Sequence, residues 1–379
     1  MHRYFTFTLL LFAATHIKAQ TTISGSFVHG GITRSYSFYV PASYVPGQAL
    51  PLVLNLHGLG TDGAYQAQYR DFRPIADTAN FIVAHPDGSM MLGQHFWNYG
   101  LVLGSTVDDI GFLEALVDTI SAHYSINPNR IYSTGASNGG FMCYALACQS
   151  NRFAAIAAVT GSMSVNMYNT CNPSYPIPTM HIHGTNDQIN PYVGNSTMKG
   201  IEEVTAFWVD QNNCTATPVI TSIPNNNMTD NATAERYLYA NGNEGHTVEL
   251  FKITGGGHTW PGAFVSTSNG NTCMDFSACI EIWRFFSQHE RGETASLNHE
   301  IHEHSINIWP NPGNGIFSIQ SENALVTTVA LFDLQGRLIE KHSGENIQTL
   351  DLSHLSSGNY LLRISGKHFN TFKRIQISA

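Results

Sequence analysis

The chain has 379 residues, a formal net charge of -9 at pH 7, and only 12% charged residues. This length predicts two domains rather than one. The negative balance and the lack of any basic cluster argue against nucleic acid and anionic membranes as partners. A surface that is polar but poorly charged is common in secreted proteins.

The N-terminus predicts a signal peptide over residues 1–19. His2 and Arg3 precede an apolar stretch over 4–14, and Ala19 closes a plausible cleavage site. The apolar stretch is too short to span a bilayer, although a membrane anchor is the alternative interpretation. Six cysteines in an exported chain indicate disulfides, but spacing alone does not give their pairing. None of them forms a convincing zinc pattern.

Residues 20–291 alternate buried-type strands with helical patterns. Helices are predicted over 109–123, capped by Asp108, and over 280–288. Strands are predicted over 51–56, 81–84, 131–134, 179–183 and 248–253. Repeated strand–helix–strand order predicts a mostly parallel sheet covered on both faces, which is the α/β class.

The character of the chain changes after a polar stretch over 292–305, which is predicted to be a linker. Short alternating strands separated by Pro, Gly and Asn turns follow, over 316–319, 326–333, 337–340, 360–364 and 372–377. This pattern predicts a small all-β sandwich over 306–379.

A Gly-x-Ser-x-Gly pattern over 135–139 carries the first chemical signal. A β-rich segment leads into it and an apolar helical segment leads out, so the chain is expected to turn sharply at Ser137. Small flanking residues suit a turn at which the strand and helix backbones nearly touch. The motif therefore predicts Ser137 as a nucleophile.

A serine nucleophile needs a base, and the base needs an orienting carboxylate. Asp187 follows a strand that breaks at Gly184, although a turn-capping carboxylate is the alternative. Among 18 histidines, His258 stands out because it follows three glycines just after the strand that ends near Ile253. The alternative for His258 is a loop histidine beside a packed tryptophan. His181 and His183 lie in or next to a strand and are expected to be structural.

The remaining candidates surround this predicted triad. The backbone N–H groups of Leu59 and Asn138 are expected to bind an oxyanion. Trp97 and Trp260 are candidate cleft walls for flat or polymeric esters, with core packing as the competing interpretation. His57 either orients the Leu59 loop and the substrate or is a core histidine bonded to backbone.

Residues 30–290 resemble secreted poly(3-hydroxybutyrate) depolymerases and feruloyl esterases, α/β-hydrolases related to carbohydrate esterase family 1. The matching motifs lie at 56–58, 108–112, 134–140, 183–187 and 256–262. The resemblance implies an α/β-hydrolase fold and a Ser137–His258–Asp187 triad that uses no metal or cofactor. It also makes a disulfide between Cys148 and Cys171 plausible. The family often has a cysteine at positions equivalent to 239–245, and its absence here leaves the partner of Cys214 open.

The C-terminal part resembles the type A sorting domain of the type IX secretion system. The matching pieces lie at 309–315, 331–337 and 355–360, with Lys373 and Arg374 near the end. A tryptophan, Trp309, replaces the usual tyrosine before the first proline. The resemblance implies export across the outer membrane, with the type IX machinery as a partner.

Together these features predict a secreted or cell-surface serine carboxylic-ester hydrolase. Its expected substrate is a polymer-linked ester, either a polyhydroxybutyrate-type polyester or a feruloyl or acetyl ester of plant polysaccharide. The alternatives are a serine peptidase of the same fold and a non-catalytic secreted glycan-binding protein. A monomer is the default expectation. Substrate choice is expected to reside in the loops over 90–105 and 190–200.

Overall fold

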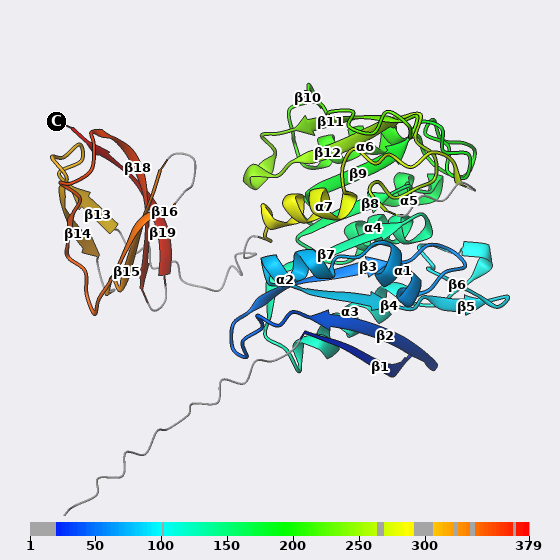
Figure 1. Ribbon diagram of the computed structural model, residues 1–379. Helices are drawn as coiled ribbons and strands as arrows, with labels where there is room; N and C mark the ends of the chain where they lie inside the picture. The colour runs from blue at the N-terminus through cyan, green and yellow to red at the C-terminus, as the bar shows by residue number, and fades with distance from the viewer. Residues whose placement is uncertain are drawn as a thin grey trace, which may run out of the picture. The chain divides into compact units, whose positions relative to one another are not determined.

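The computed structural model describes residues 20–100, 102–263, 269–291, 306–321, 325–333, 338–366 and 369–378. The predicted signal peptide (1–19) and linker (292–305) lie outside these ranges. The chain divides into two compact units, Met1–Glu293 and Thr294–Ala379 (Figure 1). No helix in the described ranges is long and apolar enough to cross a membrane.

A ten-stranded sheet forms the centre of the first unit, in the order β1-β2-β4-β3-β7-β8-β9-β12-β11-β10. Its parallel middle is β4 (Ile82–Pro86), β3 (Leu50–Leu56), β7 (Ile126–Ala136), β8 (Ala155–Val159), β9 (Thr179–Gly184) and β12 (Val248–Thr254). The mostly parallel sheet predicted from buried apolar runs is thus confirmed. The antiparallel edges are β1 (Thr21–His29) with β2 (Ile32–Val40), and β11 (Thr233–Tyr239) with β10 (Val219–Ser222).

Helices cover both faces of this sheet, and each face has its own apolar core. Phe112 of α3, Tyr144 of α4 and Trp208 of α6 belong to one core, whereas Ala76 of α2 and Phe286 of α7 belong to the other. The helices are α1 (Gly63–Tyr69), α2 (Arg73–Ala79), α3 (Asp109–Ser121), α4 (Asn138–Gln149), α5 (Val165–Thr170), α6 (Ile201–Gln211) and α7 (Ala278–Ser287). Short elements are β5 (Ser89–Met91), β6 (Gln94–Phe96), η1 (Val102–Gly104) and η2 (Asn243–Gly245). The predicted cap of α3 is present, since Asp108 accepts a hydrogen bond from the Gly111 amide.

The second unit contains two small antiparallel sheets that share one core. β13 (Ile306–Trp309), β14 (Ile316–Ser321) and β17 (Thr349–Asp351) form one sheet. β16 (Leu338–Ser343), β15 (Thr328–Phe332), β18 (Gly358–Gly366) and β19 (Phe369–Ile377) form the other. Phe317 and Leu350 of the first sheet pack in the same cluster as Val329 and Leu362 of the second, as expected for a sandwich.

One disulfide, between Cys148 at the end of α4 and Cys171 after α5, forms in the described chain. It is the pair that the family resemblance suggested. Cys143 is fully buried in the core beneath the Ser137 turn, and Cys214 is a half-buried free thiol.

Candidate active site

Ser137 occupies a strained turn between β7 and α4. Its φ of 53° and ψ of -117° lie in a region that side chains rarely adopt. The turn is compact because a Cβ at Gly139 would come within 2.5 Å of the Leu56 carbonyl oxygen. The Ser137 amide donates to the Val159 carbonyl at 2.8 Å, which ties the turn to β8. The sequence therefore holds the serine hydroxyl at the carboxyl edge of the sheet.

Asp187 and His258 meet at the same edge because they follow the parallel neighbours β9 and β12. His258 Nδ1 lies 2.7 Å from Asp187 Oδ2. The other carboxylate oxygen accepts from the amides of Ile189 at 2.9 Å and Asn190 at 2.8 Å. Burial alone would raise the pKa of Asp187, but hydrogen bonds from His183 and His258 lower it overall. Asp187 is therefore an ionised carboxylate that orients the imidazole.

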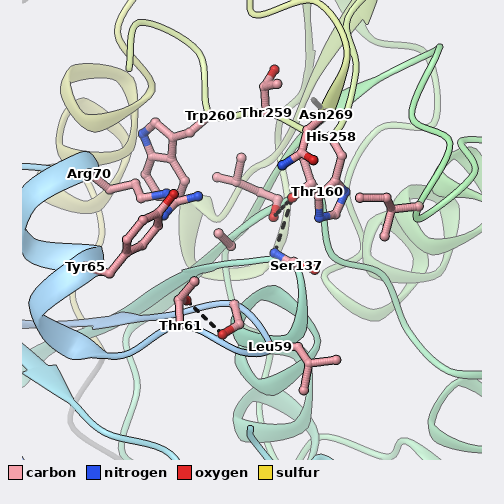
Figure 2. Close-up of a pocket in the computed structure, with 14 residues that line it drawn as sticks. Leu59, Thr61, Tyr65, Arg70, Ser137, Thr160, His258, Thr259, Trp260 and Asn269 are labelled. Carbon is pink, nitrogen blue, oxygen red and sulfur yellow. Dashed lines mark hydrogen bonds between the residues drawn. The ribbon is translucent and has the colours of Figure 1, made fainter. Parts of the chain in front are cut away.

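Ser137 and His258 line one cavity of about 270 Å³ (Figure 2). Within the described residues, the Ser137 hydroxyl makes no hydrogen bond to the His258 ring. Such contacts often tighten only when substrate binds. The structure thus joins Asp187 to His258 directly and brings Ser137 to the same cavity.

The two amides expected to bind an oxyanion belong to a cavity residue, Leu59, and to the residue after Ser137, Asn138. Leu59 is 54% exposed and lines the cavity, while Asn138 begins α4. Neither amide donates to another group in the part of the chain that the structure describes. The Asn138 side chain exchanges hydrogen bonds with the Trp97 backbone, at 2.6 and 3.1 Å, which fixes the start of the helix. The role of the two amides in binding an oxyanion stays a prediction.

Trp97 and His57 were expected to contact substrate, but neither lines the cavity. They support the backbone of the site instead. Trp97 is fully buried in the core, and its indole N–H donates to the His57 carbonyl at 3.0 Å. His57 Nε2 accepts from the Gly88 amide at 2.8 Å, and its Nδ1 donates to the Gly58 carbonyl at 2.7 Å. Burial lowers the pKa of His57 to about 4, so the ring is neutral. Trp260 does line the cavity, as predicted.

A buried chain of hydrogen bonds behind Asp187 was not anticipated from the sequence. His183 Nε2 lies 3.2 Å from Asp187 Oδ2 and 2.8 Å from the Asn190 carbonyl. His183 Nδ1 is 3.0 Å from His181 Nε2, and His181 Nδ1 bonds to the Tyr144 hydroxyl. Burial lowers the pKa of His181 well below its usual range, so this ring is neutral. The alternation of His181 and His183 on one strand face was the available signal.

One cluster of potential metal ligands occurs in the described ranges, away from the cavity, at Asp230, Cys273 and Asp275. Its carboxylates are already engaged by the backbone. Asp275 Oδ1 accepts from the Asn226 and Asn227 amides at 2.7 and 2.9 Å, and Asp230 Oδ2 accepts from the Met274 amide at 2.7 Å. These bonds explain the cluster as a brace between loops.

Comparison with known proteins agrees with this organisation. Residues 75–258 match the prolyl oligopeptidase family, and residues 307–378 match the secretion system C-terminal sorting domain. A bifunctional acetylxylan esterase/xylanase of Neocallimastix patriciarum is 27% identical over 260 residues, covering 68% of this chain and 34% of that protein. Feruloyl esterase B of Piromyces equi is 27% identical over 230 residues, covering 58% of this chain and 41% of that protein.

A poly(3-hydroxybutyrate) depolymerase of Ralstonia pickettii is 32% identical over 144 residues, covering 35% of this chain and 29% of that protein. The chain thus spans less than half the length of each of these three relatives. The parallel sheet, the serine turn and the family match all point to one fold. The first unit has the α/β-hydrolase fold, esterases are among the relatives of the chain, and residues 307–378 match the secretion system C-terminal sorting domain.

Proposed function

We propose that this chain is a serine carboxylic-ester hydrolase in which Ser137 is the nucleophile, His258 the base and Asp187 the orienting acid. The observation that carries the proposal is the 2.7 Å contact between His258 Nδ1 and Asp187 Oδ2 at the cavity that also holds Ser137. A neutral imidazole bonded in this way presents a free Nε2 to a hydroxyl.

The reaction follows from these positions. His258 Nε2 takes the proton of the Ser137 hydroxyl as Oγ bonds to the ester carbonyl carbon, and the Leu59 and Asn138 amides bind the resulting oxyanion. The tetrahedral intermediate breaks its bond to the alcohol oxygen, and His258 gives the proton to that oxygen. Water then gives a proton to His258 and attacks the acyl-enzyme. Collapse returns the proton to Ser137 and releases the acid. No metal or cofactor enters these steps.

The proposed substrate is a polymer-linked ester. The names of the relatives support three classes: acetylated xylan, feruloylated polysaccharide and polyhydroxybutyrate. A panel of acetylated xylan, methyl ferulate and hydroxybutyrate oligomers would rank them.

We also propose that residues 1–19 direct export and that residues 306–379 address the chain to the type IX machinery, leaving a secreted or surface-attached monomer. The match of 307–378 to the sorting domain supports this route. Deleting 306–379 should retain the enzyme inside the cell, as fractionation would show.

The direct test is Ser137→Ala assayed on p-nitrophenyl acetate and butyrate. Loss of the nucleophile should lower kcat by about a thousandfold or more. Ser222→Ala, at an exposed position on β10, is the matched control and should keep full activity. Undiminished turnover by the purified Ser137→Ala protein would reject the assignment.

A serine peptidase is the second candidate, because the matching family model is that of prolyl oligopeptidases. Ester and amide substrates with the same acyl group separate the two, since a peptidase should cleave the amide efficiently. A non-catalytic glycan-binding protein should cleave neither and should not react with a fluorophosphonate.

A further inference from the structure

Arg70 lies on the wall of the cavity that holds Ser137, at the end of α1. Figure 2 shows Arg70, Tyr65 and Trp260 together on one side, with Ser137 and His258 on the other. The guanidinium carbon lies 5.2 Å from the Tyr65 ring centre and 6.0 Å from that of Trp260. A cation thus sits between two aromatic rings beside the proposed reaction centre.

This cation lacks a carboxylate partner within the described ranges. Its Nε and Nη1 atoms are buried and make no hydrogen bond. The neighbouring carboxylate of Asp71 is occupied by Arg73, through two contacts of 2.8 Å. Burial lowers the pKa of Arg70, an effect that the adjacent Tyr65 hydroxyl opposes.

Two other arginines that are at least partly buried in this domain are paired with carboxylates. Arg34 bonds to Asp109 at 2.7 Å and Arg284 to Glu249 at 2.5 Å. Burying a guanidinium without an anion costs free energy. A guanidinium at a cavity wall that has no carboxylate partner therefore indicates a site for an anionic ligand.

The backbone of Arg70 is held in place by buried polar groups. Its carbonyl accepts from Asn55 Nδ2 at 3.0 Å, and Asn55 Oδ1 accepts from Gln66 Nε2 at 2.7 Å. Asn55 and Gln66 are fully buried, and Asn55 belongs to the central strand β3. The guanidinium is therefore carried on a rigid support rather than on a free loop.

We infer that Arg70 is a subsite for a carboxylate carried by the ester substrate, so that the enzyme prefers esters bearing a free carboxylate. This inference rests on the proposed function and narrows its substrate class. A guanidinium attracts a carboxylate by its charge and donates charge-assisted N–H···O bonds to it, which gives affinity. The carboxylate belongs either to the acyl part, as in a half-ester of a dicarboxylic acid, or to the alcohol part, as at the end of a hydroxyacid oligomer.

Two substrate pairs distinguish these sources. The acyl pair is p-nitrophenyl hemiglutarate against p-nitrophenyl pentanoate. The alcohol pair is the butyryl ester of 3-hydroxybutyrate against the same compound with its carboxylate methylated. The wild type should prefer the charged member of at least one pair. Arg70→Gln should reduce that preference about tenfold or more and leave the neutral member within about threefold.

Arg73→Gln is the matched control, because it removes the same charge from a guanidinium paired to Asp71 outside the cavity. It should leave the preference unchanged. Equal ratios in wild type and Arg70→Gln for both pairs would overturn the inference, as would a wild-type preference for both neutral members. If no ester is cleaved in a Ser137-dependent manner, the proposed function fails instead.

A second measurement needs no Arg70 variant. Glutarate or 3-hydroxybutyrate should inhibit wild-type hydrolysis of p-nitrophenyl pentanoate competitively, and uncharged 1,5-pentanediol should not. Absence of inhibition by both anions would contradict the carboxylate subsite even if Arg70→Gln does not fold.

Discussion

Replacing His183 with phenylalanine should weaken catalysis although His183 does not line the cavity. His183 Nε2–H is shared between Asp187 Oδ2 at 3.2 Å and the Asn190 carbonyl at 2.8 Å. Removing it takes a donor away from a buried carboxylate and leaves the His181 ring without its acceptor. We therefore treat His183 as a positioning residue.

The size of the effect follows from the bonds that remain. A hydrogen bond to a charged group contributes about 1.5–3 kcal/mol, which is roughly 10- to 150-fold. Asp187 keeps its hydrogen bonds from Ile189, Asn190 and His258, so the effect should lie at the lower end of this range. We expect kcat/KM to fall about tenfold. The acid limb of the pH–rate profile should move to higher pH, because more of the carboxylate charge then acts on the imidazolium.

The assay is the pH dependence of kcat/KM on p-nitrophenyl butyrate for three variants. His183→Phe removes the donor, His183→Gln keeps an N–H near the Nε2 position, and Tyr144→Phe removes only the far end of the chain. Glutamine should restore most of the activity. A folded His183→Phe protein with wild-type kcat/KM and an unmoved acid limb would refute the reasoning.

Three further predictions concern stability. Burial lowers the pKa of His57 and His85 to about 4 from 6.5. Between pH 4 and pH 6.5 the unfolded chain therefore binds more protons than the folded chain. The free energy of unfolding should be highest above about pH 6.5 and should fall by up to about 3 kcal/mol for each ring as the pH drops to 4. A free energy of unfolding in urea that does not change over this pH range would contradict this. The Cys148–Cys171 bond joins residues 23 apart in sequence, and reducing it should lower the free energy of unfolding by about 3 kcal/mol. An unchanged melting temperature after reduction would contradict this prediction. Ser137→Gly should be inactive yet more stable than Ser137→Ala by about 1 kcal/mol, because glycine accepts the φ of 53°; equal denaturant midpoints would show that the turn is unstrained.

The central strands and α3 were predictable because burial dictates their residues. β3 is apolar at nearly every position and lies between two parallel neighbours. The edge strand β10 escaped prediction because its residues are exposed and carry no apolar pattern. Helix α1 escaped as well, since it is short and its place depends on the Gln66–Asn55 bond, a tertiary contact.

The candidate site was also predictable only in part. The sequence indicated that Asp187 and His258 would each follow a strand of the sheet, and the two residues do lie in contact. Trp97 and Trp260 look alike in sequence and both are buried, but only Trp260 lines the cavity. Arg70 gave no signal, because its position at the cavity depends on α1.

The most direct test of the central claim is covalent labelling of the full chain with diethyl p-nitrophenyl phosphate, followed by peptide mapping. The account predicts one equivalent of p-nitrophenol released, a diethylphosphoryl group on Ser137 and loss of esterase activity. A label on another residue, or full activity in the labelled protein, would contradict it.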